Sequence, residues 1–239
     1  MSGPSKQKKK QYSLPGDQYE EKSSPMKPTR LCLPLGRIVI IAGMGGSGKS
    51  NLIHYLCVES APLFAYGLIL SPTSEDGAYN YFDVRYVQSH FDEGFISAII
   101  EQQKLTHHNN VLLILDDCLG SVHWNSDIMT QLLTCSRRFR ITCVISTQYI
   151  SKLPTFVREC ATEAYVYAQK IATSLKAVHE TFLMEKFARS QEAIPWFQKE
   201  TSIPFSALHY NKLAAPDLRY ETIIAPNMDE DKRKIRFYV

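Results

Sequence analysis

The feature that most constrains this chain is the run Gly43-Met44-Gly45-Gly46-Ser47-Gly48-Lys49-Ser50. It follows the apolar run 37–42 and precedes residues 51–56, whose composition suits a helix. A strand, a glycine-rich loop and a helix in this order make the phosphate-binding pattern G-x-x-x-x-G-K-[ST]. A glycine-rich turn without function is the alternative, and the flanking strand and helix disfavour it. The chain is therefore expected to fold around a sheet whose first strand carries a phosphate loop.

The residue types of this loop suit a triphosphate and its metal ion. Backbone amides at a helix N-terminus point toward an anion, and the helix dipole favours negative charge there. Glycine allows positive φ and a close approach of the backbone to the ligand. Lys49 is expected to reach the β- and γ-phosphates, and the Ser50 hydroxyl to ligate Mg²⁺. The predicted nucleotide-binding residues are Gly43, Gly45, Gly46, Ser47, Gly48, Lys49, Ser50 and Asn51.

Strands and helices are expected to alternate after the loop. Strands are predicted over 36–42, 65–70, 84–87, 111–115, 141–146 and 163–168, and helices over 48–59, 93–103, 126–135 and 171–188. The run 111–115 is apolar throughout, as expected of a central parallel strand covered on both faces. The predicted fold class is α/β: a three-layer P-loop NTPase with a mostly parallel sheet and helices on both faces.

Composition divides the chain into three parts. Residues 1–30 carry seven basic and three acidic side chains and few apolar ones, which predicts a disordered basic arm. That arm is either a solubilising tail or a segment that binds nucleic acid or a partner. Residues 31–190 form the predicted ATPase core. The pattern changes after Pro195, and the extension 191–239 is expected to add edge strands over 205–212 and 218–224 or to contact a neighbouring subunit.

The bulk composition excludes several classes of protein. The net charge of +3 neither requires nor excludes a nucleic-acid partner. The six cysteines lack C-x-x-C spacing, so neither a disulfide framework nor a structural metal site is expected. The chain contains no apolar run of about 18 residues, so we expect no transmembrane helix and no membrane partner.

Two acids follow the central strand. Asp116 and Asp117 end the apolar run 111–115, which is the arrangement of a Walker B motif beside a phosphate loop. Asp116 is predicted to hold Mg²⁺ together with Ser50. Asp117 is predicted to act as general base toward an attacking water or to orient that water. A solvated strand end is the alternative interpretation of the pair.

The next strand also ends in polar residues. Thr147 and Gln148 follow 141–146, and ligands of open α/β sheets bind at the carboxyl ends of the strands. Gln148 is therefore predicted to hydrogen-bond the γ-phosphate or the attacking water and so to report the state of the nucleotide. The alternative is an ordinary polar loop residue.

Three arginines precede that strand. Arg137, Arg138 and Arg140 lie at its amino end, away from the phosphate site of their own subunit. In a ring they are placed to reach a neighbour's ATP, where an arginine finger stabilises the charge that develops during phosphoryl transfer. Arg137 and Arg138 are the predicted candidates for this arginine finger. A basic solvated loop or a contact with DNA phosphates is an equally weighted alternative.

These motifs together resemble the FtsK–HerA superfamily of DNA-pumping ATPases. The resemblance rests on the phosphate loop, on the strand that ends in Asp116-Asp117, and on Arg137 placed eleven residues before Gln148 in an Ile-Ser-Thr-Gln context. The continuation 149–154 and the pair Val157-Arg158 are most similar to the poxvirus-type genome-packaging ATPases of large DNA viruses and virophages. The resemblance covers residues 36–168.

The resemblance implies a RecA/ASCE-like ATPase that uses ATP and Mg²⁺. It further implies a homo-oligomeric ring, expected to be a hexamer, that threads double-stranded DNA and docks on viral capsid vertex proteins. The implied location is the host-cell cytoplasm or a viral factory, with presence in the virion left open. Candidate DNA contacts are the loop 104–110, with His107 and His108, and Lys152.

Two other functions compete with a packaging motor. A P-loop nucleoside or polynucleotide kinase would use residues 170–200 as a lid, although their basic side chains form no arginine cluster. A nucleotide-gated DNA-binding or assembly factor would bind ATP and hydrolyse it poorly. We therefore expect a DNA-packaging ATPase, with the kinase and the assembly factor as alternatives.

Overall fold

The structure is a computed structural model that describes residues 31–74, 77–106, 108–231, 233–235 and 237. The predicted basic arm 1–30 lies outside the described residues, as does His107. Residues 31–239 form a single compact unit. Within the described ranges, no helix is both long and apolar enough to cross a bilayer.

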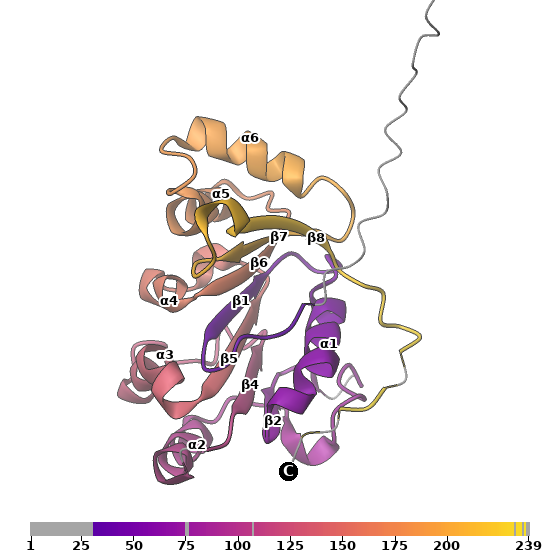
Figure 1. Ribbon diagram of the computed structural model, residues 1–239, viewed down its shortest axis with the longest axis vertical. Coiled ribbons are helices and arrows are strands. Elements are labelled where there is room, and N and C mark those ends of the chain that lie inside the picture. Colours follow the sequence, from indigo (N-terminus) through magenta and orange to yellow (C-terminus); the bar gives the residue numbers. More distant parts are fainter. Residues whose placement is uncertain (1–30, 75–76, 107, 232, 236, 238–239) are drawn as a thin grey trace, which may run out of the picture. The chain divides into compact units, whose positions relative to one another are not determined.

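The unit is built on one eight-stranded sheet in the order β3-β2-β4-β5-β1-β6-β7-β8 (Figure 1). The strands are β1 (Ile38–Ala42), β2 (Tyr66–Leu70), β3 (Val87–Gln88), β4 (Val111–Asp116), β5 (Ile141–Thr147), β6 (Glu163–Tyr167), β7 (Ser206–Asn211) and β8 (Tyr220–Ile224). The first six strands in that order pair in parallel, and β7 pairs antiparallel with both β6 and β8. The predicted mostly parallel sheet is confirmed.

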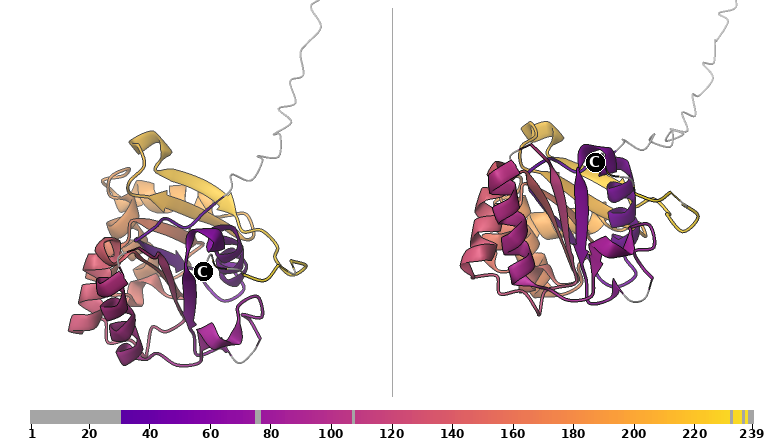
Figure 2. Two further views of the ribbon diagram at one scale, coloured as in Figure 1. Left: turned by 60° about the horizontal axis from the view of Figure 1, so that its bottom comes forward. Right: turned by 90° about the horizontal axis from the view of Figure 1, so that it is seen from below.

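Helices cover both faces of this sheet. One face packs against α2 (Glu93–Thr106), α3 (Asp127–Phe139), α4 (Thr155–Cys160), α5 (Ala172–Val178) and α6 (Ser190–Glu200). The other face packs against α1 (Lys49–Ser60) and an aromatic segment at Tyr79–Phe82. Seen from below, the sheet lies between α2 and α3 on one side and α1 on the other (Figure 2). The predicted three-layer α/β fold is therefore confirmed.

The strands of the central sheet are apolar on both faces because both faces are covered. Every residue of β1, β4 and β5 is buried. Parallel strands covered on both sides are expected to be continuous apolar runs, and this pattern in residues 111–115 predicted β4 as a central strand. Ser126 is the N-cap of α3, and its hydroxyl accepts a hydrogen bond from the Met129 amide (3.2 Å).

The helical part after β6 differs from the prediction. The single helix expected over 171–188 is wrong: α5 ends at Val178 and a π-helical turn, His179–Leu183, follows. The change coincides with the buried Arg158 guanidinium, which donates to the Ala177 carbonyl (3.3 Å) and the Thr181 hydroxyl (2.7 Å). An engaged carbonyl changes the helix hydrogen-bonding pattern, and π-turns form at such points.

The strand–helix alternation changes after Pro195, as expected, but α6 runs through this residue from Ser190 to Glu200 before the two strands begin. Pro195 is inside α6, where it has no amide to donate to the residue one turn before it. One further local prediction needs correction. The strand expected over 84–87 is reduced to the two residues of β3, and a short 3₁₀ turn covers Val84–Tyr86.

The strands that were expected in the extension join the same sheet. β7 and β8 continue it beyond β6, so residues 206–211 and 220–224 belong to the central sheet. The chain that leaves β8 then passes α1 (Figure 1). It is fixed there by an ion pair between Arg233 and Glu59 (2.9 Å) and a backbone hydrogen bond from Ile235 to Tyr81 (2.9 Å).

Candidate nucleotide-binding site

Strand register brings the predicted motifs to one edge of the sheet. Ala42 at the end of β1 pairs with Thr147 on β5, and Asp116 at the end of β4 pairs with Ser146. Because β5 lies between β1 and β4, Gln148 leaves the sheet between the phosphate loop and the two aspartates. Ligands of α/β sheets bind at this carboxyl edge.

The phosphate loop has a shape that only glycine permits at two positions. A Cβ on Gly43 would lie 2.6 Å from the Ser47 hydroxyl oxygen and 2.7 Å from the Tyr167 Cβ. Gly48 caps the N-terminus of α1 with φ of +101°, and its carbonyl accepts a hydrogen bond from the Tyr167 hydroxyl (3.2 Å). Tyr167 therefore braces the loop from β6.

Two hydroxyls at this edge are buried without a partner. The oxygen atoms of Ser47 and Ser146 find no hydrogen-bond acceptor or donor among the described residues. Buried polar groups are usually paired, so an unpaired hydroxyl beside a phosphate loop points to a ligand. Of the other loop residues, Gly45, Gly46 and Ser50 are exposed and Asn51 is half-buried in the first turn of α1.

Lys49 is folded onto its own loop. Its ammonium donates to the carbonyls of Gly43 (2.7 Å) and Met44 (3.1 Å). Partial burial lowers the pKa of Lys49 below its ordinary value, and the carboxylates of Asp116 and Asp117 oppose that shift. The ammonium is thus held close to both acids, within the loop that would enclose a phosphate chain.

Asp116 is buried and is held by a tyrosine that the sequence did not suggest. The Tyr79 hydroxyl donates to the Asp116 carboxylate and also lies 3.2 Å from the Ser71 hydroxyl oxygen. Burial raises the pKa of Tyr79, and the Asp116 charge adds to the rise, so the phenol keeps its proton and remains a donor. Carboxylate and hydroxyl oxygens are ligands that Mg²⁺ prefers, so Asp116 and Ser50 fit the metal predicted for them.

Asp117 and Gln148 contact each other directly. The Gln148 side-chain amide donates to an Asp117 carboxylate oxygen (2.8 Å), and both side chains are half-buried. Asp117 has a φ of +54°, a left-handed conformation that aspartate tolerates better than most residues. This backbone turns the Asp117 side chain toward Gln148, away from the direction that the strand would have given it.

The predicted arginines lie at the opposite edge of the sheet. Arg137 and Arg138 are exposed on the last turn of α3, and Arg140 follows as its left-handed cap, just before β5 begins. β5 has seven residues, so its two ends are roughly 20 Å apart. These arginines therefore cannot reach the phosphate loop of their own chain.

The candidate DNA contacts are divided between the two edges. Lys104 pairs with Glu101 (2.6 Å), and the Arg140 guanidinium donates to the His108 carbonyl (3.2 Å), both at the edge away from the phosphate loop. Lys152 is exposed and follows β5 at the carboxyl edge. The structure therefore does not gather these residues into one surface.

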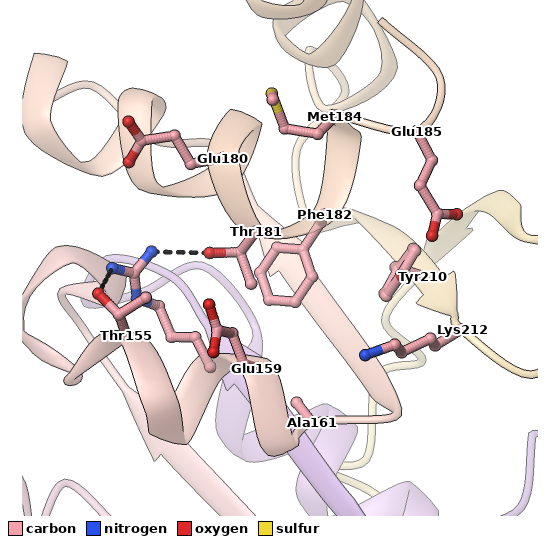
Figure 3. Close-up of a pocket in the computed structure, with 11 residues that line it drawn as sticks. Thr155, Glu159, Ala161, Glu180, Thr181, Phe182, Met184, Glu185, Tyr210 and Lys212 are labelled. Carbon is pink, nitrogen blue, oxygen red and sulfur yellow. Dashed lines mark hydrogen bonds between the residues drawn. The ribbon is translucent and has the colours of Figure 1, made fainter. Parts of the chain in front are cut away.

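Two cavities differ in their relation to the site. A cavity of about 160 Å³ adjoins the loop and is lined by Met44, Gly45, Gln148, Tyr149, Gln169, Lys170 and Ile171. A second cavity of about 150 Å³ lies between α4, the π-helical turn and β7 (Figure 3). Its lining residues Ala161 and Lys212 lie at the amino end of β6, whereas the phosphate loop lies at the carboxyl edge of the sheet. This second cavity is therefore not part of the nucleotide site.

In sequence, the chain is similar to two viral proteins of undescribed activity. It is 22% identical to protein 075L of Invertebrate iridescent virus 6 over 152 residues. This match covers 60% of this chain and 59% of the relative. It is 23% identical over 154 residues to protein 088R of Invertebrate iridescent virus 3, covering 62% of this chain and 59% of that protein. The matches thus span about three fifths of these relatives' length. No protein-family model matches the chain.

In structure, the chain is similar to nucleotide-binding packaging and conjugation proteins. The genome packaging NTPase B204 of Sulfolobus turreted icosahedral virus 2, in complex with AMPPCP, matches with a TM-score of 0.61 at 18% identity, covering 80% of this chain and 99% of that one. The two chains share the mostly parallel, helix-covered sheet of a P-loop NTPase. The pCW3 conjugation coupling protein TcpA with ATPγS matches with a TM-score of 0.56 at 12% identity, covering 81% of this chain and 62% of that one. The fold class predicted from the motifs is confirmed.

Sequence analysis missed the residues that brace the site. Tyr79 and Tyr167 come from segments that carry no nucleotide-binding motif, and each contacts the site through its hydroxyl. The only available signal was the aromatic density of residues 79–82, which is also typical of core packing. The catalytic and binding roles of the predicted site residues stay predictions.

Removing only the Tyr79 hydroxyl tests whether this residue positions Asp116. We expect Tyr79→Phe to raise about 10-fold or more the Mg²⁺ concentration needed for half-maximal binding of an ATP analogue, since partners of metal ligands affect metal affinity on that scale. Calorimetric titration measures this. Tyr81→Phe is the matched control, because Tyr81 is equally buried but its ring stacks on His54 (3.8 Å between centroids). Equal Mg²⁺ dependence in the two variants would contradict the assignment.

Proposed function

We propose that this chain is an ATP-driven translocase that packages double-stranded viral DNA into a preformed capsid. The observation that carries the proposal is the convergence of Lys49, Asp116 and the Asp117–Gln148 pair at one edge of a P-loop ATPase sheet. The similarity in fold to a genome packaging NTPase supports the packaging role over other uses of the same chemistry.

The proposed reaction is hydrolysis of the γ-phosphate of ATP. The loop amides and Lys49 would bind the phosphate chain, and Ser50 and Asp116 would hold Mg²⁺. Mg²⁺, when bound, would neutralise the charge of the phosphate oxygens. Asp117 would accept a proton from the attacking water as the bond between the γ-phosphorus and the leaving ADP oxygen breaks.

Gln148 is proposed to sense the nucleotide through its hydrogen bond to Asp117. Its amide can donate to Asp117 or to a phosphate oxygen, and a water placed between Asp117 and the γ-phosphate would compete for the same groups. Binding and loss of the γ-phosphate would therefore change what Gln148 contacts. Gln148 leads directly into Tyr149 and the exposed Lys152, so this change is proposed to move a DNA-contacting segment.

The proposed assembly is a homo-oligomeric ring, most simply a hexamer, that encloses DNA. The arginines provide the argument, since Arg137 and Arg138 are exposed about 20 Å from their own site. A neighbouring subunit that presents this edge to the phosphate loop would complete the active site. Capsid vertex proteins are the proposed docking partners, and the host cytoplasm or a viral factory is the proposed location.

The kinase alternative is disfavoured by the position of its supposed lid. Buried residues of α5 and α6, among them Val178, Ala193 and Phe197, belong to the hydrophobic core. A segment packed into the core is poorly suited to open and close over a phosphate acceptor. The assembly-factor alternative shares the nucleotide site and differs only in turnover, so the following experiment separates it from a motor.

The direct test is ATP hydrolysis with and without double-stranded DNA at a protein concentration where rings form. We expect that DNA stimulates hydrolysis in the unaltered protein and that Lys49→Ala does not hydrolyse ATP. Asp117→Asn should still bind ATP, but its hydrolysis rate should fall about 10²–10⁴-fold. Asparagine tolerates the positive φ of residue 117, so this variant is expected to fold normally. Genome packaging that survives Lys49→Ala, or a protein that does not hydrolyse ATP in either condition, would contradict a motor.

Mixing two inactive variants tests whether an arginine acts across subunits. Arg137→Ala is expected to bind ATP but to lose about 10³–10⁵-fold in turnover, as measured for arginine fingers. Rings formed from equal amounts of Arg137→Ala and Lys49→Ala would contain interfaces with both an intact loop and an intact arginine, so activity should return. Arg138→Ala is the matched comparison one residue away. Full activity in both arginine variants would exclude either residue as the finger.

A further inference from the structure

The direction in which a bound nucleotide must extend follows from the order of the strands. Asp116 lies on β4, and β5 separates it from the phosphate loop that follows β1. The γ-phosphate and its metal ion would lie on the Asp116 side of the loop, because Asp116 and Ser50 are the oxygen ligands available there. The nucleoside end of the same molecule must then point the other way, toward β6, β7 and β8.

The segment that lies on that other side begins with Phe205. β7 starts at Ser206 and pairs there with Ile224 at the end of β8, and the neighbouring Tyr167 and Ala42 belong to the same carboxyl edge. A Cβ on Gly48 would lie 3.4 Å from the Phe205 Cδ1 atom and 3.3 Å from the Ala225 Cβ atom. The residue that precedes β7 therefore lies beside the phosphate loop, with room for little more than a Cβ between them.

Phe205 has two features that packing alone does not explain. Its side chain is 55% exposed although its edge contacts the loop. Its φ is +64°, a conformation that a bulky side chain rarely adopts. The backbone is held there by hydrogen bonds from Ser206 to the Ile203 carbonyl (3.1 Å) and from Ala225 to the Phe205 carbonyl (3.0 Å). Strained backbone maintained by surrounding structure is typical of ligand-binding positions.

We propose that the Phe205 ring stacks against the base of the bound nucleotide and forms the base subsite. The inference rests on the proposed function, since it assigns the other end of the same ATP molecule. A nucleobase supplies the flat π-face that an exposed aromatic ring next to a phosphate loop can cover. Stacking recognises the face of the base and not its hydrogen-bonding edge, so it favours purines over pyrimidines and separates adenine from guanine weakly.

The variant Phe205→Ala tests the stack. Alanine substitution of an aromatic that stacks on a base typically weakens binding about 5- to 100-fold, and we expect a loss in that range for a nonhydrolysable ATP analogue. Phe205→Tyr keeps the ring and should bind as the unaltered protein does. Leu218→Ala is the control, because Leu218 is exposed on the same hairpin but lies at its other end. Calorimetry gives the dissociation constants.

Inorganic tripolyphosphate separates the base subsite from the phosphate loop. Phe205→Ala should bind it as tightly as the unaltered protein does, whereas Lys49→Ala should lose both ligands. Equal ATP-analogue binding in Phe205→Ala and the unaltered protein would overturn the inference and leave the proposed function intact. Equal loss of tripolyphosphate and the analogue in Phe205→Ala would also overturn it, since Phe205 would then act through the loop. If the unaltered protein binds neither ligand, the proposed function fails together with the inference.

Discussion

The parallel pairing of β5 between β1 and β4 is the constraint on which the rest of the structure depends. It aligns Ala42 with Thr147 and Asp116 with Ser146, so that three strands end at one level. The phosphate loop, the paired acids and Gln148 each follow one of these strands directly. A shift in register along β5 would move Gln148 away from Asp117, and a shift by one residue also turns every side chain to the other face. Because the side chains of all three strands are buried and closely packed on both faces, such shifts would break that packing.

The same edge holds most of the unusual local features of the molecule. Gly48, Asp117 and Phe205 all have positive φ and lie around the loop. Two buried hydroxyls beside them, those of Ser47 and Ser146, are unpaired among the described residues. The opposite edge differs in kind, since it presents exposed basic side chains on the last turn of α3 and at its cap. In the proposed ring, this separation would give each subunit one edge that binds a nucleotide and another that completes a neighbour's site.

The sequence predicted the central strands and the site residues because each carries a local signal. β1 is apolar throughout, β4 is apolar up to Asp116, and β5 is mostly apolar with three hydroxyl residues, while polar residues lie where β4 and β5 end. Residues that depend on long-range contacts were not predictable. Tyr79 reaches Asp116 from 37 positions away, and Phe205 reaches Gly48 only because β7 joins the sheet next to β6. The π-helical turn after Val178 likewise coincides with contacts of the distant Arg158, which no helical periodicity reveals.

The most direct test of the central claim is an experimental structure with Mg²⁺ and a nonhydrolysable ATP analogue. The account predicts one triphosphate bound to the amides of residues 45–50, with the Lys49 ammonium moved from the Gly43 carbonyl to the phosphate oxygens. The metal ion should lie between Ser50 and Asp116, and Gln148 should face the γ-phosphate. A nucleotide bound at another surface, or a triphosphate in the loop with Asp116 and Gln148 turned away from it, would contradict the account.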